Sequence, residues 1–128
     1  MNKLTWTFQI LLALVFGLFG AQKVVMPIPD LIEFGMWWIE DFPAWQVRVI
    51  GALEVLGAVG LVAPYGIKAL PRMIVPLAAG GLALTMIGAI ATHVQRQDPT
   101  PSIVITSVLF VLSVVVAVRR FKEARAES

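Results

Sequence analysis

The sequence predicts an all-α membrane protein, in which four transmembrane helices form one bundle and a short amphipathic helix lies between the first two. Three observations support this fold class. The apolar fraction is 59% and the charged fraction is 14%, whereas soluble domains are about one quarter charged. The mean hydropathy is +0.86. Four apolar stretches approach the length of about 20 residues that a spanning helix needs, and proline and glycine mark their joints.

We expect a single domain over the 128 residues, since one compact unit is typical of this length. The expected spans are 6–25, 46–63, 73–94 and 102–118. The first span has an alternative interpretation: Lys3, an apolar run and a small-residue end resemble a secretory signal peptide. We expect this segment to be retained as a membrane span.

Basic residues are distributed unevenly between the two ends of such a bundle. One end holds seven of them: Lys3, Lys68, Arg72, Arg119, Arg120, Lys122 and Arg125. The other end holds three: Lys23, Arg48 and Arg96. This bias predicts a cell-membrane protein with both termini in the cytoplasm, and we expect no nucleic-acid partner. The basic tail, 119–128, is expected to be a solvated helical extension that anchors at anionic lipid headgroups.

The first outer loop is expected to form the amphipathic helix, over about 30–42. At 100° per residue its four acidic side chains fall within an arc of about 100°, and apolar side chains cover most of the rest. Pro43 should stop this helix. We expect it to lie on the outer surface of the membrane. There it would close the outer end of the bundle or serve as a docking surface.

Glu54 is the one carboxylate in the apolar stretch 48–64. A charge at the membrane centre costs about 2.5–3.5 kcal/mol on insertion scales, so a partner or water must offset this cost. Gly51 and Gly57 flank Glu54 on the helix surface and Ala58 shares its face, which favours close packing against another helix. We therefore expect Glu54 to point into the bundle.

Antiparallel alternation places two further polar residues near the level of Glu54. The sequence predicts an outer-half polar cluster of Lys23, Glu54 and His93, with Gln22 as a hydrogen-bonding neighbour and Arg48 at the rim. In simpler interpretations, Lys23 extends to the headgroups and His93 is an interfacial residue. The chain has no cysteine and one histidine, which makes a metal site a poor fit. No arrangement of nucleophile and base is recognisable, so we do not expect an enzyme acting on its own.

Two stretches of sequence resemble the DoxX-like family of small four-span membrane proteins. They are "FGLFGAQKV" at the end of the first span and "VIGALEVLGAVGLV" in the second. Lys23, Glu54, Gly51 and Gly57 match the family pattern most closely. The resemblance implies a compact four-helix bundle. The family includes a small subunit of an archaeal thiosulfate:quinone oxidoreductase and an oxidoreductase-associated protein of mycobacteria. An animal relative that assists receptor assembly also resembles this group.

Three functions stay open at this stage. The first is a non-catalytic scaffold, assembly factor or accessory subunit of a membrane complex, in which the polar cluster fixes helix register. The second is a quinone- or lipid-binding subunit of a membrane oxidoreductase, in which the cluster contacts the ligand. The third, a small proton-coupled transporter, is disfavoured because the membrane glutamate is not in the first span. The sequence leaves the ligand, the partner and the oligomeric state open.

Overall fold

The computed structural model describes residues 2–127, and this range consists of helices and their connections without a strand. The elements are α1 (Asn2–Val25), α2 (Ile28–Glu33), the 3-10 helix η1 (Trp37–Asp41), α3 (Ala44–Gly66), α4 (Ile74–Arg96) and α5 (Thr100–Glu127). The all-α prediction is therefore confirmed.

Four of these helices are long and apolar enough to cross a membrane. The segments are Lys3–Val25, Ala44–Gly66, Ile74–Arg96 and Thr100–Ala126, each longer than the expected span. Large apolar side chains such as Leu14, Leu56 and Leu84 point away from the protein and are about two-thirds exposed. In water this surface would be costly, whereas lipid solvates it without penalty.

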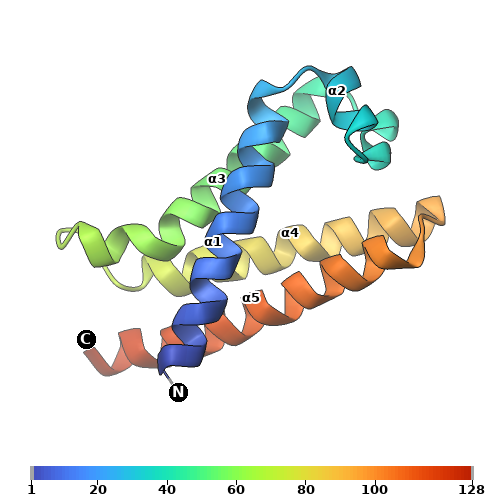
Figure 1. The fold of residues 1–128 in the computed structure, drawn as a ribbon. Helices are drawn as coiled ribbons and strands as arrows, with labels where there is room; N and C mark the ends of the chain where they lie inside the picture. Colours follow the sequence, from blue (N-terminus) through green and yellow to red (C-terminus); the bar gives the residue numbers. More distant parts are fainter. Residues whose placement is uncertain (1, 128) are drawn as a thin grey trace.

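The bundle consists of two helix pairs that cross each other (Figure 1). α1 packs mainly on α3, α4 packs mainly on α5, and smaller contacts join α3 to α4 and α1 to α5. Both termini lie at one end, called here the terminal end, whereas α2 and η1 lie at the other, called the capped end. The central core is apolar and includes Leu12, Phe16, Leu61, Leu82 and Val116.

The segment expected as one amphipathic helix is divided into two. α2 is the short helix between the first two spans, and it ends where Gly35 takes a φ of +119°. Glycine adopts this conformation without the clash that a Cβ would cause, so the chain turns before η1 begins. Leu31 of α2 and Ile39 of η1 are both buried, together with Val47 of α3. The continuous helix over 30–42 was therefore wrong, and much of the segment's apolar surface packs on the protein.

The basic tail is a helical extension, as expected, but it is solvated only in part. α5 continues unbroken to Glu127, and Arg120 is only 4% exposed. Its Nε donates a hydrogen bond of 2.8 Å to Gln9 Oε1 in α1, and Gln9 Nε2 donates to the Leu61 carbonyl oxygen in α3 at 2.5 Å. The guanidinium group also faces the ring of Trp6, 5.0 Å from its centroid. Arg120 therefore joins three helices at the terminal end.

Candidate ligand-binding site

A buried ion pair joins α1 and α3 in the half of the bundle nearer the capped end. Lys23 Nζ lies 2.6 Å from Glu54 Oε1, and the two residues are 8% and 3% exposed. At this distance the contact is both an ion pair and a charge-assisted hydrogen bond. The structure thus brings together two of the residues that the sequence analysis singled out.

Two glycines allow α1 and α3 to approach closely enough for this contact. A Cβ at Gly20 would lie 2.8 Å from the Gly51 carbonyl oxygen, and a Cβ at Gly51 would lie 2.6 Å from Lys23 Cβ. Both distances are shorter than a carbon atom tolerates. Six residues further along α3, a Cβ at Gly57 would lie 2.6 Å from a methyl carbon of Leu82 in α4. Small residues on α3 therefore set its distance from both neighbours.

Ala58, the third expected packing residue, is buried in the central core. A Cβ at Gly17 of α1 would lie 3.6 Å from the Ala58 Cβ, which is ordinary contact. The structure therefore places Ala58 on the face of α3 that packs against α1.

Arg48 holds the end of α1 instead of contacting the ion pair directly. Its Nη1 donates to the carbonyl oxygens of Lys23 (2.9 Å) and Met26 (2.5 Å). In a continuing helix the Lys23 carbonyl would accept from residue 27, but Pro27 has no N–H. Arg48 supplies the missing donor, so α3 caps the last turn of α1. Gln22, in the same turn, is half-buried with its Oε1 lacking a partner among the described residues.

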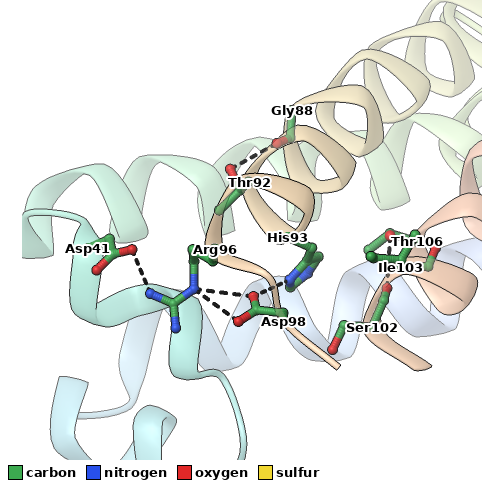
Figure 2. A network of polar contacts seen from close by, with 9 residues as sticks. All are labelled: Asp41, Gly88, Thr92, His93, Arg96, Asp98, Ser102, Ile103 and Thr106. Atoms are coloured by element: carbon green, nitrogen blue, oxygen red, sulfur yellow. Dashed lines mark hydrogen bonds and ion pairs between the residues drawn. The ribbon is translucent and has the colours of Figure 1, made fainter. Parts of the chain in front are cut away.

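His93 does not form a hydrogen bond with Lys23 or Glu54, contrary to the expectation of one three-residue cluster. Its Nδ1 lies 2.7 Å from Asp98 Oδ2 (Figure 2). The reason is local: Gln97 ends α4 in the left-handed conformation, with φ of 57°, and the Asp98 N–H donates to the His93 carbonyl oxygen. This Schellman turn folds the chain back so that Asp98 lies beside the imidazole.

Arg96 extends this pair into a polar network at the capped end. Its Nε lies 3.2 Å from both Asp98 carboxylate oxygens, and its Nη1 donates to Asp41 Oδ2 at 2.6 Å (Figure 2). The network therefore links the end of η1 to the end of α4. The hydrogen bond from His93 holds the pKa of Asp98 below its ordinary value. Partial burial opposes this lowering of the pKa, whereas Arg96 adds to it. Asp98 is therefore the negatively charged partner of His93 and Arg96.

A cavity of about 430 Å³ lies between the ion pair and His93. Its polar lining includes Lys23, Glu54 and His93, which lie on α1, α3 and α4. Apolar side chains from all of the spans and from the capped end form most of the remaining wall. Six of them are Phe16, Phe19, Trp38, Leu53, Met86 and Leu109. The three residues expected to form one cluster therefore line one cavity.

Trp38, Asp98 and Gly20 contribute to the site although the sequence analysis did not select them. Trp38 lines the cavity and places its ring centroid 5.6 Å from Lys23 Nζ, a distance typical of a cation–π contact. The sequence signal for Asp98 was its position five residues after His93, just past the end of the helix. The signal for Gly20 was its place one turn before Lys23, where a close helix contact is needed.

The described residues offer no site of metal-ligating type. Within residues 2–127, no three His, Asp or Glu side chains come together. The site is instead an apolar cavity with a few buried or half-buried polar groups, a form typical of sites for small organic molecules.

Four spanning helices with such a cavity define a small multi-pass membrane protein. The model of the DoxX-like family matches residues 7–116, which contain Lys23, Glu54 and His93. The chain therefore belongs to the DoxX-like family. No curated protein and no solved structure matches it.

Proposed function

We propose that this protein binds a small amphipathic molecule, a quinone or a lipid, in the cavity at the capped end. The observation that carries the proposal is the cavity of about 430 Å³ beside the Lys23–Glu54 pair. Small-molecule sites in proteins occupy about 300–1,000 Å³ and combine mostly apolar walls with a few polar groups. The cavity has this size and this composition.

The two kinds of wall suggest how the molecule would lie. Phe16, Phe19 and Leu53 would contact an apolar body, such as an isoprenoid or acyl chain. Lys23 and Glu54 on one side, and His93 on the other, would contact the polar head. Trp38 would stack on a flat head or cover a chain.

In a membrane oxidoreductase, this chain would serve as the subunit that holds a quinone. The sequence has no cysteine, so the chain offers no thiolate ligands for an iron–sulfur cluster. A partner protein would therefore supply the electron carrier, and this chain would position the quinone. The buried and paired Glu54 gives the alternative of a proton-coupled transporter no support.

A matched pair of substitutions on α4 tests the binding proposal. Ala89→Phe would add a ring to the lining of the cavity, whereas Ala91→Phe would add the same ring on an exposed face. We expect a short-chain ubiquinone to quench the tryptophan fluorescence of the wild type and Ala91→Phe saturably, and that of Ala89→Phe weakly. Equal quenching of all three proteins, or no saturable quenching of any, would refute quinone binding in this cavity.

A second candidate function is that of a non-catalytic scaffold or accessory subunit of a membrane complex. The observation that favours it is the close 2.6 Å contact of Lys23 with Glu54, since a buried polar pair can fix helix register. Glu54→Gln keeps the side-chain shape and removes the charge. A scaffold predicts that this variant loses its assembly with membrane partners. Normal assembly together with lost ligand binding would favour the binding function.

We also propose that both termini face the cytoplasm. Seven of the ten basic residues lie toward the terminal end in a four-span arrangement, and three toward the capped end, as the positive-inside tendency requires. Cysteine introduced at Lys68 should be labelled by a membrane-impermeant maleimide only in inverted vesicles. Labelling of intact cells would instead show that the orientation is the opposite one.

A further inference from the structure

The threonine hydroxyl groups that line the cavity already donate hydrogen bonds to backbone carbonyl oxygens. Thr85 donates to the Gly81 carbonyl oxygen at 3.0 Å and Thr92 to that of Gly88 at 2.9 Å. Thr106 donates to Ser102 in the same way (Figure 2). A carbonyl oxygen only accepts, so each threonine is the donor of its bond. Toward a ligand, these three hydroxyl oxygens can therefore act only as acceptors.

His93 adds another acceptor. Its Nδ1 lies 2.7 Å from the Asp98 carboxylate, which can only accept, so the ring proton belongs on Nδ1. In a neutral imidazole the other nitrogen then carries a lone pair. Nε2 is thus the ring atom available to accept a hydrogen bond from a molecule in the cavity.

Each charged side chain at the cavity already has an ionic partner. Lys23 is paired with Glu54 at 2.6 Å, and Arg96 is shared between Asp98 at 3.2 Å and Asp41 at 2.6 Å. An anionic head entering here would meet carboxylates whose cations are already engaged, and a cationic head would displace Lys23. Burying a further unpaired charge is costly, so the cavity is suited to an uncharged head.

We infer that the ligand is an uncharged amphiphile whose head carries a hydroxyl group, such as a long-chain alcohol, a sterol or a prenylated hydroquinone. A hydroxyl donates to the acceptors around it and can also accept from Lys23, whose ammonium group has three N–H donors. A ketone or an ether has no O–H group to donate, and a carboxylate is charged. This inference rests on the proposed binding function, and it specifies the chemical class of the ligand.

Three probes share one chain length and differ in the head group, so they measure its effect on binding: myristyl alcohol, methyl myristyl ether and myristate. Binding to the purified full chain in nanodiscs would be measured by displacement of a brominated alcohol that quenches Trp38. We expect the alcohol to bind about 3- to 10-fold more tightly than the ether, which is the range expected for one net hydrogen bond. We expect myristate to bind more weakly than the alcohol at neutral pH.

A prenylated hydroquinone and its oxidised quinone provide an independent pair, and the reduced form should bind more tightly. His93→Phe should shrink the preference for alcohol over ether, whereas Val94→Phe, at an exposed position of the same helix, should preserve it. Equal affinity for alcohol and ether, or a preference for myristate, would overturn the inference and leave amphiphile binding intact. Failure of every probe to bind saturably would instead overturn the proposed function.

Discussion

The Lys23–Glu54 pair makes a quantitative prediction about stability. The two residues are 8% and 3% exposed and their charged atoms are 2.6 Å apart, so solvent screens the pair weakly. Removing one partner of a buried pair costs about 3–5 kcal/mol, because the other charge stays buried without compensation. We therefore expect Lys23→Met and Glu54→Leu each to lower the free energy of unfolding by about that amount.

The double variant decides whether this reasoning is right. Replacing both charges by apolar side chains removes the uncompensated charge, and such replacements are often neutral or stabilising by about 1–4 kcal/mol. The double variant should therefore be close to the wild type in stability. The assay is unfolding of the protein in dodecyl maltoside by added dodecyl sulfate, followed by circular dichroism.

Lys68→Met is the matched control, because it makes the same substitution at an exposed residue of the α3–α4 connection. It should change the unfolding midpoint little, as exposed charges contribute little. Additive losses in the double variant, or a Lys23→Met protein as stable as Lys68→Met, would refute the account of a tightly coupled buried pair.

Three further predictions follow from other contacts. Gly51→Ala should destabilise the protein by about 1–3 kcal/mol, the usual cost of overpacking, because its Cβ would lie 2.7 Å from the Gly20 carbonyl oxygen; detergent unfolding measures this. Arg120→Met should cost about 1–3 kcal/mol in the same assay, since it leaves the buried Gln9 Oε1 without its donor. The lowered pKa of Asp98 means that its contacts stabilise the fold fully above the ordinary carboxyl pKa, and this stabilisation is lost as pH falls through the lower folded value. Asp98→Asn should remove that acid-side dependence from thermal unfolding curves.

Controls for these predictions are available in the same chain. Gly88→Ala places its Cβ in open space and should not destabilise the protein. Lys122→Met removes an exposed charge near the end of the same helix as Arg120, and it should leave the unfolding midpoint nearly unchanged. An Asp98→Asn protein with an unaltered acid-side profile would show that the contact with His93 does not set the pH dependence.

The fold class followed from the sequence because lipid imposes simple requirements on it. A spanning helix needs a long apolar run whatever its neighbours are, so composition and length alone identify the four spans. The contact between Lys23 and Glu54 could be anticipated for a related reason. Charges inside apolar spans are few, and each needs a partner.

The features that the sequence analysis missed depend on tertiary contacts or on a single backbone conformation. Gly35 interrupts the expected amphipathic helix by adopting a positive φ, which the apolar periodicity does not reveal. Arg120 lies among residues typical of a cytoplasmic tail, yet it shares a buried face of α5 with Val116 and Ala124. The spacing of four residues between these three positions is the helical signal that could have identified it.

The position of His93 was predicted only in part. Its place near the end of α4 brings it to the same cavity wall as Lys23 and Glu54. Its hydrogen-bond partner was set by the turn at Gln97, where the left-handed conformation brings Asp98 back beside the ring. Such a conformation is uncommon for residues other than glycine, so apolar patterning could not anticipate it.

The central claim, that the cavity at the capped end holds an amphipathic molecule, is tested most directly by an experimental structure of the protein in lipid. The account predicts elongated non-protein density between Trp38 and the helices that carry Lys23, Glu54 and His93, with its polar end near these three side chains. A closed cavity, in which Trp38 packs directly against Met86 and leaves no space beside the Lys23–Glu54 pair, would contradict it.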